Sequence, residues 1–479
     1  MSPVGAAPRL WGSLCLVAAM GCSDSMEPSR ADHIASVFLE ADASLLRERP
    51  GLVAGKYARM AEDLFSFYRG TMPLWLSDAA RGAHPASAFD LRDPMPVCIG
   101  DSHPENFGTL RASDGTLAVE ANDFDAADRT PYLWDLRRLT VGLVLAARLS
   151  NPDDPGARAQ AAAAARDVAR AAARSYAEAV TALAGGAPPQ RLERPEAPAL
   201  EALFEAATKA AEKRSELDAL TEVVGGERRL LRGVLDLAEP THALVDLPAA
   251  AREELPETLA AWRQTLVTPP PEEHMLVKDA ARELGTGVAS WPRVRALVLV
   301  EGPSDDLDDD LVLEVKELAE SGAPGAGWPG EPGRRILETT RALWARPDAD
   351  PLWGVATWQG FAVQVRTEAA SHRNLRVHRL QGPAGKRKAL IALGRDLGGL
   401  VGRMHGVGEG AAIAAVIGGD IEGFANEQAE ASLGLADAFE RDWGLFQSIL
   451  SERGPLLGHV HDPAAPPAAL RDLFTEPPY

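Results

Sequence analysis

The stretch that decides the fold is residues 97–108, VCIGDSHPENFG, which is followed after a short turn by residues 119–125, VEANDFD. In each segment an apolar run, expected to form a buried strand, leads directly into residues rich in Asp and Asn. Asp101 and Asn106 lie in the first loop, and Asp123 ends the second run. Because both runs end in oxygen-bearing side chains, we expect the two loops to build one site.

Carboxylate and amide oxygens suit a hard divalent cation such as Mg²⁺, which usually shares its protein ligands with phosphate. In phosphotransferases one Asp orients the attacking hydroxyl, while an Asn and a later Asp hold metal on the phosphates. The alternative is that these residues only cap turns and helices. Capping does not require so many acidic groups at the ends of adjacent strands, so the pattern favours a metal-dependent phosphotransferase site.

Two of these motifs resemble a known superfamily. Residues 100–106, GDSHPEN, resemble the catalytic loop of aminoglycoside and choline phosphotransferases in the protein-kinase-like superfamily, and residues 122–125, NDFD, resemble their metal-binding Asp segment. Over about residues 35–450 the chain more closely resembles a bacterial family known as domain of unknown function 2252, which is grouped with the kinase-like folds. That resemblance includes residues 65–70, FSFYRG, and 134–139, WDLRRL.

The resemblance implies roles for the acidic and amide residues of the two loops: Asp101 as the catalytic Asp, Asn106 and Asp123 as metal ligands, and Asp125 as a further site acid. It also implies Mg²⁺ and ATP as cofactor and nucleotide. The chain departs from the pattern at two positions. Ile99 stands where many kinases carry a His, and Ala126 stands where the family usually has an acid.

A second group of signals lies in the second half of the chain. Gly285 and Gly287 form a Gly-rich turn before an expected strand at residues 294–300, and the return strand at residues 311–317 carries Lys316. This order resembles the nucleotide-binding part of a kinase, where glycines let backbone amides approach phosphate and the Lys pairs with phosphate oxygens. A plain hairpin turn remains the alternative for the glycines. Glu338, on the next expected helix, could pair with Lys316 as in kinases, or could be a surface acid.

The order of these motifs predicts an unusual topology. In ordinary kinases the glycine loop precedes the catalytic loop, whereas here Gly285 follows Asp101 by roughly 180 residues. We therefore expect an α+β, protein-kinase-like two-lobe fold that is circularly permuted. Its parts are a mainly helical lobe at residues 35–270, a β-rich nucleotide lobe at 271–385 and C-terminal helices at 386–455.

The N-terminus has the features of an export signal. An apolar run within residues 1–22 is too short to span a bilayer, and small residues precede Cys22 as in a bacterial lipoprotein processing site. We expect a lipid anchor at Cys22, a location in the cell envelope, and membrane contact only through that anchor. The alternative is a plain apolar N-terminus on a cytoplasmic protein. Residues 23–34 read as a flexible linker and residues 456–479 as a Pro-rich tail.

Composition limits the partners of the chain. The net charge of −20 argues against binding to nucleic acid or to anionic membranes in general. Arg69 either binds a phosphate of the nucleotide near the active loop or pairs with an acid of the fold. Residues 187–272 read as helices with little chemical signal, and His405 is expected to pack rather than react.

These observations lead to three functional hypotheses. The first is a kinase-like phosphotransferase that uses Mg²⁺ and ATP on an unknown acceptor. The second is a pseudokinase, which binds a nucleotide or a partner without catalysis. The third is a metal-dependent phosphoesterase built on the same acids together with His103.

Overall fold

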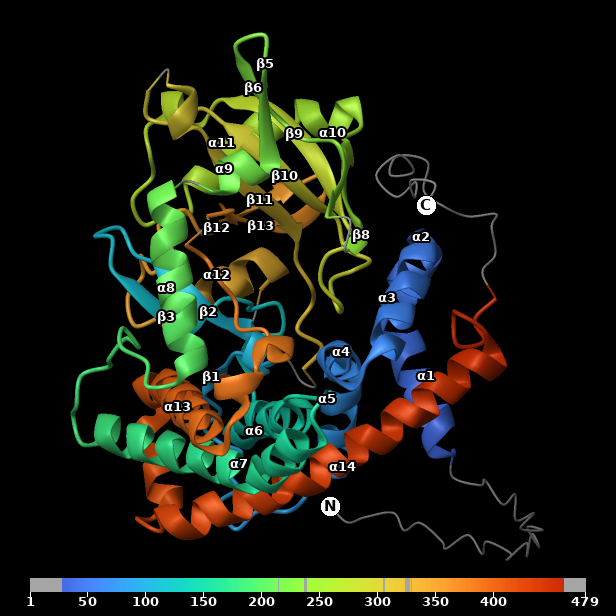
Figure 1. Ribbon diagram of the computed structural model, residues 1–479, viewed down its shortest axis with the longest axis vertical. Helices are drawn as coiled ribbons and strands as arrows, with labels where there is room; N and C mark the ends of the chain where they lie inside the picture. The colour runs from blue at the N-terminus through green and yellow to red at the C-terminus, as the bar shows by residue number, and fades with distance from the viewer. Residues whose placement is uncertain are drawn as a thin grey trace, which may run out of the picture.

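The computed structural model describes residues 28–460, apart from 214, 237–238, 305, 324–327, 329 and 370. The predicted signal peptide and the tail from residue 461 lie outside the described residues. Helix α1 begins at Arg30, inside the segment predicted as a linker. The fold mixes helices with antiparallel sheet, which confirms the α+β prediction. Figure 1 shows the large sheet at one end of the molecule and the long helices at the other.

The helical part is built around a close pair of long helices. Its helices are α1 (Arg30–Ala41), α2 (Ala43–Glu48), α3 (Pro50–Glu62), α4 (Leu64–Gly70), α5 (Met72–Ala80), α6 (Tyr132–Leu149), α7 (Pro155–Ala184), α13 (Arg387–Ile417) and α14 (Ile421–Arg453). A Cβ atom at Gly394, Gly398 or Gly402 would lie 2.6, 2.1 or 2.5 Å from a backbone oxygen of α7. Glycine at every fourth position therefore lets α13 approach the Ala-rich α7 backbone directly. By length and composition alone α13 could cross a membrane, and half of its most apolar window is buried inside the fold.

The large sheet carries the glycine turn and Lys316. Its strands are β7 (Gly233–Asp236), β8 (Glu239–Asp246), β9 (Val277–Leu284), β10 (Arg295–Val300), β11 (Leu311–Glu317), β12 (Gly354–Trp358) and β13 (Phe361–Thr367). Among the described residues their order is β12-β13-β11-β10-β9-β8-β7, and every pairing is antiparallel. The predicted strands at 294–300 and 311–317 are confirmed as β10 and β11. Helix α12 (Pro332–Leu343) connects β11 to β12.

The helical prediction for residues 187–272 is only partly right. Helices α8 (Pro198–Lys213), α9 (Ser215–Leu220), α10 (Ala249–Glu253) and α11 (Leu255–Arg263) are present, but β5 (Thr221–Val224), β6 (Glu227–Leu230), β7 and β8 are strands. Gly225 and Gly226 both have positive φ and join β5 to β6 in a hairpin. Such a Gly-Gly pair between short strands is a hairpin signal that sequence reasoning overlooked.

The two Asp loops lie between the sheet and the long helices. Strand β1 (Val97–Cys98) pairs with β4 (Asp128–Arg129), and β2 (Phe107–Arg111) pairs with β3 (Leu117–Ala121). Short 3₁₀ turns complete the fold: η1 (Pro104–Asn106), η2 (Glu272–Met275), η3 (Leu307–Asp309), η4 (Val377–Arg379) and η5 (Gly382–Gly385). The largest buried apolar cluster joins the helices to β2 and β3, and a separate one lies between the sheet and α11. The loops are therefore anchored on a packed core.

Candidate functional site

The predicted site residues converge on one cleft of about 1850 Å³. Its walls come from α2 to α5, the Asp loops, the glycine turn, strands β9 to β13 and the segment after β13. The predicted site residues that line it are Arg69, Asp101, Asn106, Asp123, Asp125, Gly285, Gly287 and Lys316. Glu338 does not line it. Residues about 200 positions apart in the chain thus share one polar cavity.

Asp101 is held by a buried arginine. Arg138 Nε donates to Asp101 Oδ1 over 2.8 Å, and the Arg138 side chain is fully buried. Burial raises the pKa of Asp101, although Arg138 opposes this shift. Asn106 Nδ2 donates to the backbone oxygen of Asp101 over 2.8 Å. Since the amide nitrogen is used in this bond, the Asn106 side-chain oxygen is the atom available to a metal.

The backbone of this loop is fixed from α6 by Asp135. The Asp135 carboxylate accepts hydrogen bonds from the N–H groups of Ile99 at 3.0 Å and Gly100 at 3.1 Å. Gly100 has φ +83°, and a Cβ there would lie 2.0 Å from the Ala126 backbone oxygen. Glycine is therefore required at position 100, because it brings the loop against the second Asp segment. Asp135, from the Trp-Asp motif of α6, fixes the loop in this place.

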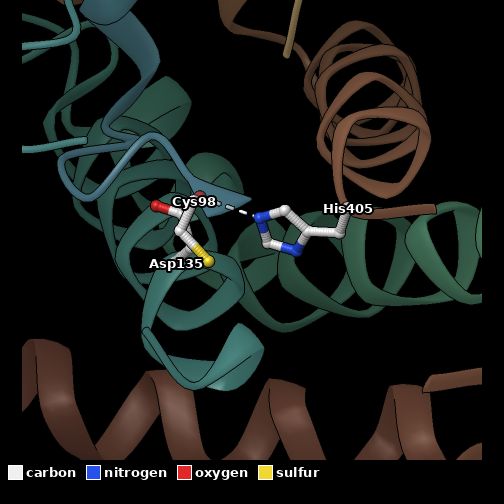
Figure 2. Close-up of side chains that lie close together, drawn as sticks. All are labelled: Cys98, Asp135 and His405. Atoms are coloured by element: carbon white, nitrogen blue, oxygen red, sulfur yellow. Dashed lines mark hydrogen bonds and ion pairs between the residues drawn. The ribbon is translucent and has the colours of Figure 1, made fainter. Parts of the chain in front are cut away.

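Cys98, Asp135 and His405 lie together in the buried interior (Figure 2). Their ligand atoms are within 4.8 Å of one another, which is compact enough for a metal ion. His405 Nε2, however, already bonds Asp135 Oδ2 over 3.0 Å, and Tyr176 Oη lies 2.9 Å from His405 Nδ1. Cys98 Sγ lies 3.6 Å from the Thr130 carbonyl oxygen. Because these groups are partnered within the protein, the cluster supports the Asp101 loop. The expectation that His405 packs is confirmed.

The charge of His405 predicts a pH-dependent stability. Burial works against protonation, but Cys98 and Asp135 raise the pKa of His405 to about 10. A raised pKa in the folded state stabilises the fold fully below about pH 6.5, and this contribution is lost as the pH rises toward 10. We expect the difference in unfolding free energy between the wild type and His405→Gln to shrink over this range, by up to about 1.4 kcal/mol per pH unit. Urea unfolding at pH 6.5, 8 and 9.5 measures it, and a constant difference would contradict the account.

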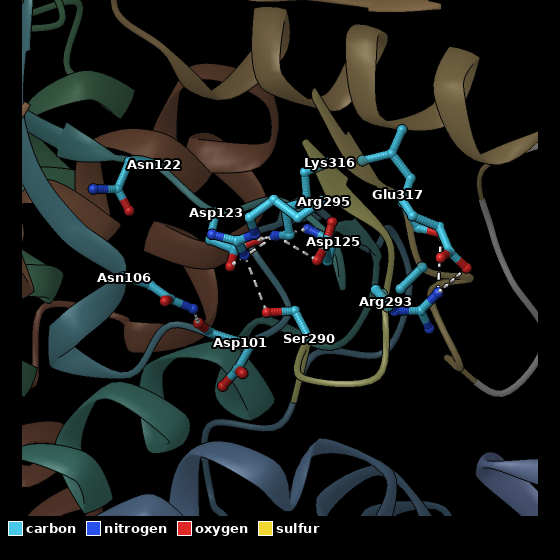
Figure 3. A network of polar contacts seen from close by, with 12 residues as sticks. Asp101, Asn106, Asn122, Asp123, Asp125, Ser290, Arg293, Arg295, Lys316 and Glu317 are labelled. Atoms are coloured by element: carbon cyan, nitrogen blue, oxygen red, sulfur yellow. Dashed lines mark hydrogen bonds and ion pairs between the residues drawn. The ribbon is translucent and has the colours of Figure 1, made fainter. Parts of the chain in front are cut away.

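The second Asp segment faces Lys316 of β11 (Figure 3). Lys316 Nζ lies 2.8 Å from Asp125 Oδ2 and 3.4 Å from Asp123 Oδ2, and its side chain is buried. Burial alone would raise the pKa of Asp123, yet Lys316 lowers it, while burial and the neighbouring Asp123 raise the pKa of Asp125. Two carboxylates and one ammonium group therefore share one buried site.

The predicted ion pair between Lys316 and Glu338 does not form. Glu338 accepts hydrogen bonds from Arg334 Nε at 2.9 Å and Trp328 Nε1 at 2.8 Å. The phase of α12 turns Arg335 inward instead, where it donates to the backbone oxygens of Asp125 at 3.0 Å and Ala319 at 2.6 Å. The Arg335 side chain of α12 thus holds the backbone of the segment that carries Asp123 and Asp125.

The glycine turn, which joins β9 to β10, lines the cleft. Gly285 and Gly287 have φ of +76° and +79°, which side chains other than glycine rarely adopt. A Cβ at Gly287 would lie 2.4 Å from Ser290 Oγ, and Arg295 donates to that same oxygen over 3.3 Å. Both glycines are therefore needed for the turn itself. The turn needs them whether it binds phosphate or is a plain hairpin turn.

Two acidic residues of the cleft, Glu314 and Glu368, were missed by sequence reasoning. Glu314 of β11 pairs with Arg295 at 2.7 Å and Arg366 at 2.8 Å on the cleft face of the sheet. Burial beside Glu314 raises the pKa of Glu368 to about 7. Alternate positions on neighbouring strands share one face of a sheet. This network could therefore be found only once it was known that β11 pairs with β10 and with β13.

Arg69, on α4, lines the same cleft. Its Nη1 is 3.1 Å from Glu105 Oε2, in the same loop as Asp101. Of the two roles expected for Arg69, the ion pair with an acid of the fold is therefore present. Arg69 also lines the cleft, where an anion can reach it.

Comparison with known families matches residues 47–449 to the family described as "Uncharacterized protein conserved in bacteria (DUF2252)". No curated protein and no solved structure matches the chain. Because the match spans most of the chain, the protein belongs to the DUF2252 family.

Proposed function

We propose that the protein is a kinase-like phosphotransferase that uses Mg²⁺ and ATP. The observation that carries this proposal is the convergence of Asp101, Asn106, Asp123 and Lys316 on one cleft. Oxygen donors from both Asp loops match the preference of Mg²⁺, and the ammonium group of Lys316 lies beside them. A donor set of this kind fits a metal-bound triphosphate.

The order of strands supports a circularly permuted kinase-like arrangement. The glycine turn joins β9 to β10, and Lys316 lies on β11, the third strand of this series. Kinases also place a glycine-rich loop between two strands and the phosphate-binding Lys on the third strand. Because these elements follow Asp101 in this chain, the nucleotide-binding part would come from the second half of the sequence.

In the proposed reaction Asp101 accepts a hydrogen bond from the acceptor hydroxyl and takes its proton. The raised pKa of Asp101 makes it a better proton acceptor than an ordinary Asp. Asn106 and Asp123 would hold Mg²⁺, which neutralises charge on the phosphates. Lys316 and the N–H groups of the glycine turn would bind phosphate oxygens. Catalysis would then consist mainly of positioning and electrostatic stabilisation.

A pseudokinase is the second candidate, and one observation favours it. Lys316 has no carboxylate partner on α12 and instead binds Asp123 and Asp125, the residues that would hold metal. If this ion pair is permanent, the nucleotide site is closed. Phosphate transfer from bound ATP separates the two candidates.

The proposal predicts that Mg²⁺-ATP stabilises the folded protein. A ligand at a hundredfold excess over its dissociation constant adds about 2.7 kcal/mol of stability. We expect the thermal midpoint to rise with Mg²⁺-ATP but not with Mg²⁺ alone, and the rise to be lost in Lys316→Ala. The matched control is Lys209→Ala, whose ammonium group is exposed on α8. No shift with Mg²⁺-ATP would contradict the proposal, and a shift with Mg²⁺ alone would favour the phosphoesterase.

A lipid anchor at Cys22 remains part of the proposal. Metabolic labelling with a fatty acid in cells would mark the wild type and not Cys22→Ser if the anchor exists. An unlabelled protein in the cytoplasm would contradict the envelope location and agree with a ready supply of ATP.

A further inference from the structure

A basic segment lies against the loop that carries Asp101. Residues 372–379, HRNLRVHR, contain three Arg and two His and no acid. The segment follows β13 and lies alongside β2: Thr109 N donates to the Arg373 backbone oxygen over 2.9 Å, and Leu375 N to that of Phe107 over 3.0 Å. Most of the segment lines the cleft. The second half of the chain therefore contributes a positively charged wall beside the catalytic loop.

Glu105 connects this wall to α4. The buried Glu105 carboxylate lies 3.1 Å from Arg69 Nη1 and 3.4 Å from Arg376 Nη1, and it accepts the Val377 N–H over 2.8 Å. Two guanidinium groups thus share one carboxylate, which leaves an excess positive charge in a partly desolvated site. Arg69 Nε is buried and has no hydrogen-bond partner among the described residues. A buried donor without a partner is costly unless a ligand satisfies it.

Asp101 and Asp123 favour the charged form of Arg69, but both already have a cationic partner of their own. Asp101 is paired with Arg138. Burial and the nearby Arg69 and Arg138 hold the pKa of His103 well below its usual value, so His103 is neutral. Burial lowers the pKa of Arg69 and the neighbouring Arg376 adds to this shift, while Glu105, Asp101 and Asp123 oppose it. A negative group bound here would favour the charged form of Arg69.

The excess charge is separate from the proposed phosphate site of the nucleotide. Lys316 contacts Asp123 and Asp125, whereas Arg69 and Arg376 contact Glu105, in the loop of Asp101. A molecule bound to the two arginines would therefore lie on the Asp101 side of the cleft, where the acceptor hydroxyl must be.

We propose that the acceptor is a small molecule that carries a phosphate or carboxylate group in addition to its reacting hydroxyl, and that Arg69 and Arg376 bind this anionic group. The inference rests on the proposed function, and it assigns Arg69 to the acceptor instead of the nucleotide. A cationic acceptor, such as an amino sugar, would be repelled by the same pair. The acceptor oxygen attacks the γ-phosphorus of ATP, the bond to ADP breaks with the electron pair leaving on ADP, and Asp101 takes the hydroxyl proton.

The test compares three probes that share a hydroxyl-bearing three-carbon skeleton: glycerol, glycerate and glycerol 3-phosphate. Binding to the full chain is measured by calorimetry with a non-hydrolysable ATP analogue and Mg²⁺ present. We expect the two anionic probes to bind at least about tenfold more tightly than glycerol, since a hydrogen bond to a charged group contributes at least that factor. We expect that preference to be lost in Arg69→Ala and Arg376→Ala. The matched control is Arg395→Ala. Arg395 is an exposed arginine of α13 that pairs with Glu196, and its variant should keep the preference for the anionic probes.

Each other outcome is decisive. Absent or equal binding of the three probes overturns the inference, and so does a preference that survives in both arginine variants. A preference that disappears in Lys316→Ala but persists in the arginine variants places the anion at the nucleotide site and also overturns it. If the ATP analogue itself does not bind, but the anion preference still depends on Arg69 and Arg376, the proposed function fails while the anion site stands. Arg376 is partly exposed, so its variant keeps the test valid if Arg69→Ala does not fold.

Discussion

Asp101→Asn is expected to slow phosphate transfer from ATP by about 10²–10⁴-fold, the usual contribution of a positioned general base. Asn keeps an oxygen that can accept the Arg138 Nε hydrogen bond, so the fold should remain intact. Nucleotide binding should also remain, because in the proposed reaction Asp101 contacts the acceptor while Lys316 contacts the phosphates. The loss is therefore expected in kcat, with little change in KM for ATP. ADP formation measures it, with water as the acceptor when no other is supplied.

The control for this variant is Asp437→Asn, whose exposed carboxylate pairs with Arg148 on the helical surface. It should keep the wild-type rate. An Asp101→Asn protein that forms ADP at the wild-type rate would show that Asp101 is not the base. A loss that appears only in KM for ATP would assign it to nucleotide binding.

Arg138→Met is expected to lower the unfolding free energy by about 3–5 kcal/mol, the cost of removing one partner of a buried ion pair. Arg138 is fully buried, donates to Asp101 and to the Tyr68 backbone oxygen at 2.6 Å, and lies 3.9 Å from the centre of the Tyr68 ring. Met preserves length and apolar contact but leaves the Asp101 carboxylate without its Arg138 donor. It also removes one of the donors to the Tyr68 carbonyl, which keeps its hydrogen bond from Thr71.

Urea unfolding of Arg138→Met beside Arg148→Met measures this effect on one helix. Arg148 lies near the end of α6 and pairs with Asp437 and Glu440 at the surface, so its loss should cost less than about 1 kcal/mol. Equal losses for the two variants would contradict the view that Arg138 anchors the Asp101 loop.

The parts of the site that could be predicted are those whose chemistry is local. Asp101 and Asn106 lie within one short loop, and Asp123 and Asp125 lie directly after one strand, so residue type and spacing were sufficient. Lys316 was recognisable because it stands in an apolar strand after a glycine turn. In each case the signal lies within a few neighbouring residues.

The parts that could not be predicted depend on long-range packing. His405 reaches Asp135 across 270 positions, and Arg376 reaches Glu105 across 271. The inward face of α12 depends on which side packs, and for this reason the expectation for Glu338 failed. Strands β5 to β7 were missed because strands of four residues are too short to show a clear alternation and owe their pairing to neighbours. Strand β8 was missed although it has eight residues.

If the two halves of the chain build one metal-nucleotide site, a metal ion must bind between them, and its position can be measured. Crystals grown with Mn²⁺ and a non-hydrolysable ATP analogue give an anomalous signal at the metal. The account predicts a peak within about 2.2 Å of side-chain oxygens of Asp123 and Asn106, with Lys316 on the phosphates. A peak at Cys98, Asp135 and His405, or no peak in the cleft, would contradict it.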